Sequence, residues 1–268
     1  SQPNTFLNPR VTFAILDILD IHSGRLILRT NPQIMAPNSR IILTRHAQAE
    51  HNVDLDYYIP DAPLTALGKK QAASLATHSK VKELAQEADL VVSSPLKRTL
   101  QTTKLGWKDA IDRLGGLSKV VCLPQAQECN DFPCDAGSSK EVLEADPEFS
   151  GFDLSLLTPD WTSKKGFWGP DPTSIRLRAK WVRQWLRDRP EKTIVLVAHG
   201  DILRQLTCSR TGPSGYMWRN AEAMIFEFDQ DTLGDLCLFK SEKGKSVAVA
   251  GGYGPSSTEA DILADGRL

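Results

Sequence analysis

The sequence is poor in cysteine and contains no paired cysteine motif. Only five cysteines occur in 268 residues, and none forms a CxxC pair. An odd number without such a pair argues against a disulfide framework and favours reduced thiols in a cytoplasmic or nuclear compartment. Cys129 and Cys134 are the nearest pair, and no second Cys or His pair follows within a short loop. We therefore expect no structural metal, because a zinc site needs about four ligands.

The sequence also lacks long apolar runs. Runs such as Phe13 to Leu16 and Ile194 to Ala198 are far too short to span a bilayer. Asp17 and Asp20 interrupt the apolar stretch that a cleavable signal peptide would need. No membrane partner is expected from this pattern.

Neither sign of charge is in excess. Thirty-two Lys and Arg residues oppose 33 Asp and Glu residues, which gives a formal net charge of −1. Without a global field, neither direct binding to nucleic acid nor binding to an anionic membrane is expected. Hydrophobic residues make up 41% and charged residues 24%, near the averages for globular proteins. Any site for an anion must therefore be local.

Short apolar, β-branched runs alternate with longer helical stretches. Such runs are typical of parallel strands that are buried on both faces. The expected central strands are 40–44, 90–93, 119–123 and 193–198, and the expected helices are 65–85, 95–105, 173–187 and 201–210. This order predicts an α/β fold, a three-layer α/β/α sandwich around a mostly parallel sheet. On the helix over 173–187, the basic stripe of Arg176, Lys180, Arg183 and Arg187 is interpreted as a solvated face.

The predicted domain spans residues 36–240, with less regular segments around and within it. Residues 1–35 are interpreted as an N-terminal extension, because Met35 stands just before the first strand as a start methionine would. Residues 138–172 form a cap-like insertion whose aromatics either shape a pocket or belong to the core. Residues 224–228 and 236–239 are expected to form an edge hairpin, and 241–268 a loosely packed C-terminal tail. An edge strand in the extension would allow an oligomer.

Three strand ends carry residues suited to an anion. Arg45 and His46 follow the first strand, and a parallel sheet places ligands at the carboxyl ends of its strands. Ser94 and Pro95 begin a helix whose first turn contains Arg98, where the helix dipole favours an anion. His199 follows another strand, and the glycine after it lets the backbone approach a ligand. The pattern predicts two imidazoles and two guanidiniums around one phosphate.

Four ordered motifs resemble the histidine phosphatase superfamily, in its phosphoglycerate-mutase-like branch and with features of its fungal-type phosphatases. The resemblance covers roughly residues 40–239. The motifs are, in chain order, Arg45-His46 with Asn52; Pro63-Leu64-Thr65 with Gly68, Gln71 and Ala72; Ser94-Pro95-Leu96 with Arg98, Gln101 and Thr102; and His199-Gly200. Ala47 replaces the glycine that usually follows the first histidine, which a backbone with negative φ tolerates.

The resemblance implies a metal-independent phosphatase without a cofactor, acting on a small phosphorylated metabolite. His46 would attack phosphorus and form a phosphohistidine. Around the phosphoryl group the resemblance places Arg45, Arg98, His199 and Asn52, and Ser94 and Gly200 are further candidate substrate-binding residues. Glu128 stands where the family commonly keeps its acid, although an exposed surface carboxylate is the alternative. Asp131 and Asp135 are runner-up acids.

Three interpretations of the site's surroundings complete the sequence analysis. His51 is expected to be a partly exposed loop residue without a role. His78 is expected to be a solvated helix residue without a role. The acidic loop with Asp54, Asp56 and Asp61 disfavours a second anionic group on the substrate, which favours hydrolysis over a mutase reaction. The alternative function is a phosphatase-fold protein that acts as a binding or scaffold subunit, or in non-hydrolytic metabolite chemistry.

Overall fold

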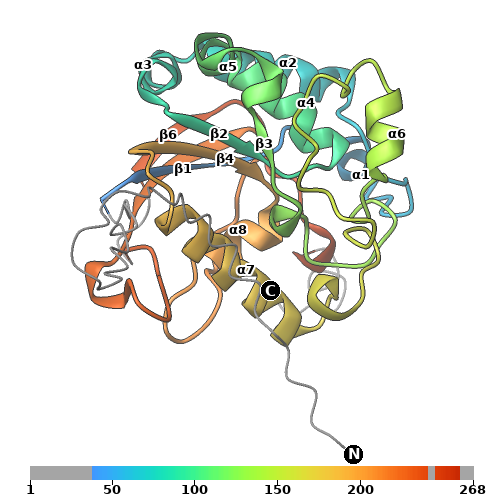
Figure 1. Cartoon of the computed structure of the whole chain (residues 1–268). Helices are drawn as coiled ribbons and strands as arrows, with labels where there is room; N and C mark the ends of the chain where they lie inside the picture. The colour runs from blue at the N-terminus through green and yellow to red at the C-terminus, as the bar shows by residue number, and fades with distance from the viewer. Residues whose placement is uncertain (1–37, 241–244, 260–268) are drawn as a thin grey trace, which may run out of the picture. The chain divides into compact units, whose positions relative to one another are not determined.

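The computed structural model describes residues 38–240 and 245–259, and a mixed sheet of six strands lies at the centre of this part (Figure 1). The strands are β1 Arg40–Arg45, β2 Leu90–Ser93, β3 Val121–Cys122, β4 Thr193–Ala198, β5 Glu222–Glu227 and β6 Lys245–Val249. Their order is β3-β2-β4-β1-β5-β6. The first four in this order are parallel, and β5 is antiparallel to both of its neighbours.

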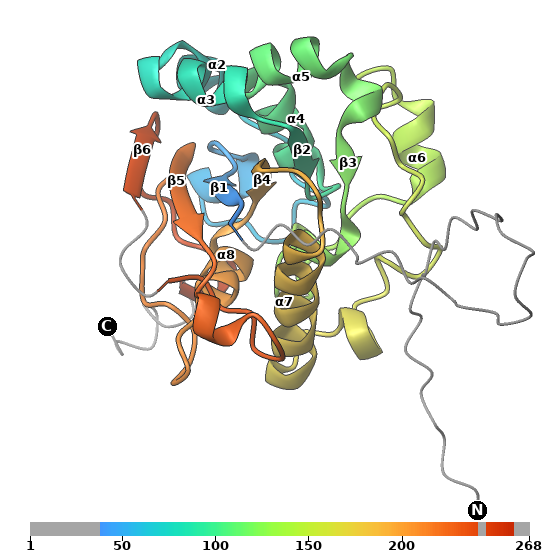
Figure 2. The same ribbon diagram turned by 60° about the vertical axis from the view of Figure 1, so that its left-hand side comes forward.

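Helices cover both faces of the sheet, as Figures 1 and 2 show. One face carries α2 Ala66–Thr77, α3 Ser79–Glu87, α4 Lys97–Gly106 and α5 Lys108–Leu114, and the other carries α7 Pro172–Arg187 and α8 Gly200–Leu206. Two short helices, α1 Glu50–Val53 and α6 Lys140–Ala145, lie in connecting segments. The three-layer α/β/α fold predicted from the sequence is confirmed. Within the described residues, no helix has both the length and the apolar character needed to cross a membrane.

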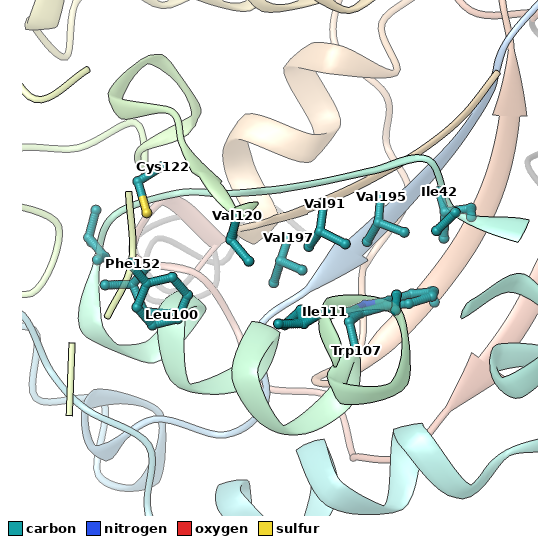
Figure 3. Close-up of a cluster of buried hydrophobic side chains, with 14 of the residues drawn as sticks. Ile42, Val91, Leu100, Trp107, Ile111, Val120, Cys122, Phe152, Val195 and Val197 are labelled. Atoms are coloured by element: carbon teal, nitrogen blue, oxygen red, sulfur yellow. The ribbon is translucent and has the colours of Figure 1, made fainter. Parts of the chain in front are cut away.

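Each central strand contributes side chains to two separate cores. On the face of α3, α4 and α5, Ile42, Val91 and Val195 pack in one cluster with Trp107 (Figure 3). The alternate residues, among them Leu43 and Leu196, pack in the other cluster with α7 and α8. Burial on both faces explains why the strands read as continuous apolar runs rather than alternating ones.

Trp107 offers a test of how much packing in the first core cluster stabilises the fold. It is fully buried at the junction of α4 and α5. We expect Trp107→Ala to lower the free energy of unfolding by about 3–5 kcal/mol, since it removes an aromatic side chain and leaves a cavity. Chemical denaturation checks this value. The matched control is Leu67→Ala at an exposed position of α2, which should change it by less than about 0.5 kcal/mol; equal effects of the two variants would contradict this account of the core.

Two predicted elements differ from those in the structure. The helix expected over 65–85 is two helices, because the backbone of His78 is extended (φ −66°, ψ 131°) between α2 and α3. The break lets Leu75 before it and Val81 after it face the same core. The strand expected over 119–123 is reduced to β3, because Leu117–Lys119 forms a 3-10 turn. Helix α5 was not predicted at all.

The edge of the sheet is formed by a different segment from the one predicted. Residues 236–239 do not pair with β5 as a strand; a single bridge joins Phe228 to Phe239. The edge strand is β6, which lies in the segment expected to be a loose tail, and that expectation is wrong for 245–259. Small residues there allow close approach: a Cβ at Gly251 would lie 2.7 Å from the carbonyl oxygen of Asn220. A low content of large apolar residues was therefore a poor indicator of loose packing.

Burial settles two open interpretations. Of the aromatics in 138–172, Phe149, Phe152, Trp161 and Trp168 belong to the first core cluster, which favours the core alternative for them. The basic stripe on α7 is not solvated throughout. Arg183 is buried and donates hydrogen bonds to the backbone oxygens of Cys237 and Gln205. The predicted extension, residues 1–35, lies outside the described residues.

Candidate active site

The two predicted histidines come together at the carboxyl ends of adjacent parallel strands. In the register of β1 and β4, Arg45 pairs with Ala198, so His46 and His199 leave the sheet side by side. Their ring centroids are 5.2 Å apart, and both side chains are buried. The geometry on which the sequence analysis depended is therefore present.

The ring of His46 is held as a neutral imidazole. Its Nδ1 lies 2.7 Å from the carbonyl oxygen of Ala47, so Nδ1–H donates there and the lone pair of Nε2 is left for chemistry. Burial lowers the pKa of His46 well below its usual value, and Arg98 and Arg45 lower it further. Ala47 is accommodated without strain, because it is not one of the described non-glycine residues with positive φ.

Two buried guanidiniums flank the histidines. Arg45 donates from Nη1 to the carbonyl oxygen of Trp218, and the backbone of Gly200 runs so close that a Cβ there would lie 3.5 Å from Arg45 Cζ. Arg98 donates from Nη1 to Cys134 O at 2.5 Å and from Nη2 to Asp135 Oδ1 at 3.0 Å. In the part of the chain that the structure describes, the Nε atoms of both arginines are buried without a hydrogen-bond partner.

His51 and His199 add two more buried nitrogens. Asn52 accepts from the backbone N–H of Ala49, so its Nδ2 donates to His51 Nε2 at 3.0 Å and leaves Nδ1–H of the neutral ring as a donor. The Ser94 hydroxyl lies 2.8 Å from His199 Nε2; in the tautomer in which the hydroxyl donates, Nδ1–H of His199 is a donor too. Both Nδ1 atoms are buried without a partner among the described residues. Burial lowers the pKa values of His51 and His199, and the charge of Arg98 lowers them further, so both rings are neutral.

These contacts create four unsatisfied donors close to His46. They are Arg45 Nε, Arg98 Nε, His51 Nδ1 and His199 Nδ1. Buried donors in proteins are nearly always paired, so their gathering around His46 suits an anion with several acceptor oxygens. His51 was misjudged: it is buried, and its ring centroid lies 5.9 Å from that of His46. Asn52 is used to orient His51.

Glu128 is buried beside the site, so the surface alternative is wrong. Its carboxyl oxygens accept from the backbone N–H groups of Cys129 at 2.9 Å, Ile202 at 3.0 Å and Asp201 at 3.2 Å. Burial raises the pKa of Glu128, and the charge of Asp135 raises it further. A carboxyl with a raised pKa is suited to donate a proton.

The two runner-up acids differ in burial. Asp131 is exposed, whereas Asp135 is buried and is paired with Arg98 through Oδ1. The other oxygen, Oδ2, accepts from the Ser257 hydroxyl at 2.9 Å. Asp201, which the sequence analysis did not use, has a pKa raised to about 7 by burial and by Glu128. Asp135 therefore orients Arg98, and Glu128 is the better candidate acid.

The acidic loop does not point its carboxylates at the site. Asp54 and Asp56 are exposed. Asp61 is buried but accepts from the Lys97 backbone N–H at 2.9 Å and the Ser138 hydroxyl at 2.7 Å, so it holds the start of α4 to the start of the inserted segment. These contacts therefore do not support the expectation that the three residues disfavour a second anionic group on the substrate.

Sequence reasoning missed two cations next to Glu128. Arg178 donates to the backbone oxygens of Gln127 at 2.5 Å and Glu128 at 3.2 Å, which fixes the turn that carries the acid. A signal was present, because Arg178 falls within the apolar stripe of Ile175, Ala179 and Val182 and must be buried with it. Lys164 donates from Nζ to the backbone oxygen of Glu128 at 3.0 Å, and nothing in the sequence around Lys164 distinguishes it from other lysines.

The fold and these contacts define an α/β protein with a buried cluster of histidine and arginine side chains at the carboxyl ends of its parallel strands. A family model described as histidine phosphatase superfamily (branch 1) matches residues 41–233. A probable phosphatase of Schizosaccharomyces pombe is 30% identical over 168 residues, which cover 61% of this chain and 75% of that protein. Phosphoglycerate mutase-like protein 1 of Arabidopsis thaliana is 30% identical over 234 residues, which cover 74% and 76%. The chain belongs to the histidine phosphatase superfamily.

Among solved structures, a variant of a phosphoserine phosphatase from Entamoeba histolytica in complex with phosphoserine matches with a TM-score of 0.47 and 22% identity. The match covers 76% of this chain and 98% of that one.

Proposed function

We propose that the protein is a phosphatase that hydrolyses a phosphomonoester of a small metabolite through a phosphohistidine at His46. One observation carries the proposal: four unpaired buried donors surround a neutral imidazole whose Nε2 is free. Phosphoryl transfer depends chiefly on positioning and on charge complementarity to the equatorial oxygens. The named phosphatase relative supports the same reaction class.

The first half-reaction forms a bond between His46 Nε2 and phosphorus while the bond from phosphorus to the ester oxygen breaks. Arg45, Arg98, His51 and His199 bind the nonbridging oxygens. Glu128 gives its proton to the leaving oxygen, so an alcohol is released. In the second half-reaction Glu128, now a carboxylate, takes a proton from water, which attacks the phosphohistidine and releases inorganic phosphate. The chemistry uses the chain's own side chains.

Phosphoenzyme trapping tests the reaction. The enzyme is treated with a metal chelator, mixed with a radiolabelled phosphomonoester and quenched with alkali. We expect label on the protein that is stable in alkali and lost in acid, as a phosphoramidate bond requires. Turnover without a labelled protein, or turnover that stops with the chelator, would contradict the proposal.

A leaving-group comparison tests Glu128. In Glu128→Gln we expect kcat on an alkyl phosphate to fall by about 10²–10⁴-fold, because a poor leaving group needs the proton. On p-nitrophenyl phosphate, whose leaving group needs none, the loss should stay below about tenfold. Steady-state kinetics on both substrates measures the difference, with Glu144→Gln on exposed α6 as control.

The pH profile gives a second readout for Glu128. Only the protonated carboxyl can donate, so activity on the alkyl phosphate should fall as pH rises through its raised pKa. That basic limb should be absent in Glu128→Gln. A limb that persists in the variant would assign the acid to another group.

A further inference from the structure

Lys164 is the one cation near the site that comes from the inserted segment 138–172, considering the residues that the structure describes. Its Nζ donates to the backbone oxygen of Glu128, the residue that holds the proposed acid. The side chain is partly buried, and its backbone is in the left-handed region (φ 53°). A lysine in that conformation is uncommon, and such outliers gather at functional sites.

The ammonium group has donors to spare. It offers three N–H donors, and one hydrogen bond uses one of them. Across residues 38–240 and 245–259, no carboxylate oxygen lies within 4.0 Å of it, whereas Arg98 and Arg204 have such partners. A partly desolvated ammonium without a carboxylate partner is costly unless a ligand supplies the negative charge.

The position of Lys164 relates it to the leaving group. The charge of Lys164 acts on His199, and the charges of Asp135 and Glu128 act on Lys164, so the ammonium lies within electrostatic range of the phosphoryl site. The phosphoryl ligands Arg45, Arg98, His51 and His199 are separate from it. The acid must face the ester oxygen, and Lys164 binds the main chain of that same residue. The ammonium is therefore held next to the residue that carries the proposed acid.

We propose that Lys164 binds a second acidic group, a carboxylate or a phosphate, on the leaving-group portion of the substrate, so that preferred substrates are phosphomonoesters carrying a second negative charge. The proposal rests on the proposed phosphatase function of the same site. It also reverses the expectation drawn from the acidic loop, whose carboxylates point elsewhere.

Two matched substrates test the proposal. 3-Phosphoglycerate and glycerol 3-phosphate differ only in a carboxylate that replaces a hydroxymethyl group. We expect wild-type kcat/KM to favour 3-phosphoglycerate by about 10–100-fold, the value of one charge-assisted contact. Lys164→Met should reduce this ratio to near one. The control Lys165→Met, at the exposed neighbouring position, should keep it. An unchanged ratio in Lys164→Met, or a wild type without preference, would overturn the proposal.

The pH dependence supplies a readout that a structural role would not move. Burial lowers the pKa of Lys164 to about 8, with Asp135, Cys129 and Glu128 opposing that shift and Arg178 adding to it. The charged form exists below this pKa, so the substrate ratio should fall as pH rises through about 8. Lys164→Arg should keep the ratio at high pH, because a guanidinium stays charged. A wild-type ratio that is flat with pH would contradict the assignment.

Calorimetric binding separates this proposal from the reaction itself. If neither substrate is hydrolysed, kcat/KM values cannot be compared, but the ratio of the two dissociation constants still reports on Lys164, whereas the trapping experiment decides the phosphatase proposal. A preference for 3-phosphoglycerate that Lys164→Met removes and Lys165→Met keeps would support the subsite. Equal dissociation constants in the wild type would overturn it.

Discussion

Replacing His46 with alanine should lower kcat by at least ~10³-fold and abolish the labelled phosphoenzyme, because the variant has no group to carry the phosphoryl bond. The ring that is lost is buried beside His199, and among the residues that the structure describes its one side-chain hydrogen bond goes to the adjacent carbonyl of Ala47. Few structural contacts therefore depend on it. Stopped assays with long incubation and the trapping experiment measure the two losses.

Two controls make this result specific. His78→Ala changes a histidine at an exposed helix end and should leave kcat unchanged. Thermal unfolding should show that His46→Ala remains folded. Retained turnover with a phosphoenzyme in His46→Ala would exclude His46 as the nucleophile, and His51, the next ring at 5.9 Å, would become the candidate.

The convergence of the site could be predicted because sheet topology turns sequence order into position. Once the segments ending at Arg45 and Ala198 are recognised as parallel strands, the residues that follow must meet at one edge, and His46 and His199 do. Arg98 could be placed by the same reasoning, since its helix begins where β2 ends. None of these inferences needed side-chain detail.

The wrong expectations concern residues whose roles depend on tertiary contacts. His51 lies in the short helix α1, in a segment that the sequence predicts as a polar loop, and only the fold shows that Asn52 orients its ring. Asp61 has the charge that seemed to oppose a second anion, yet its hydrogen bonds face Lys97 and Ser138. The number of charged residues in a loop does not show where their side chains point.

The C-terminal segment was misjudged for a different reason. Its composition resembles a tail, but serines and glycines are also the residues that pack most closely against backbone and carboxylates. Ser256 donates to Asp201 at 2.7 Å, and Ser257 donates to Asp135 at 2.9 Å. The segment therefore completes the site through polar contacts, which hydrophobic periodicity cannot detect.

Arg98→Ala should damage both stability and activity, and the two losses can be separated. The Arg98–Asp135 pair is almost fully buried, with exposed side-chain fractions of 1% and 2%. Removing the guanidinium leaves Asp135 as an uncompensated buried charge, which should lower the free energy of unfolding by about 3–5 kcal/mol. It also removes one of the phosphoryl donors, which should lower kcat by a further ~10²–10³-fold at temperatures where the variant is folded.

The double variant Arg98→Ala/Asp135→Asn distinguishes the two effects. An amide at position 135 carries no charge and can still accept from the Ser257 hydroxyl, so most of the lost stability should return. Activity should not return, because the phosphoryl donor is still absent. Denaturant titration and kinetics on all three proteins, with the exposed Arg176→Ala as reference, give the comparison. If the double variant were no more stable than Arg98→Ala, the cost would come from the lost packing and the Cys134 contact rather than from the stranded carboxylate. If it regained activity, Arg98 would serve chiefly to neutralise Asp135, and the anion site would rest on Arg45 and the two imidazole donors, His51 and His199.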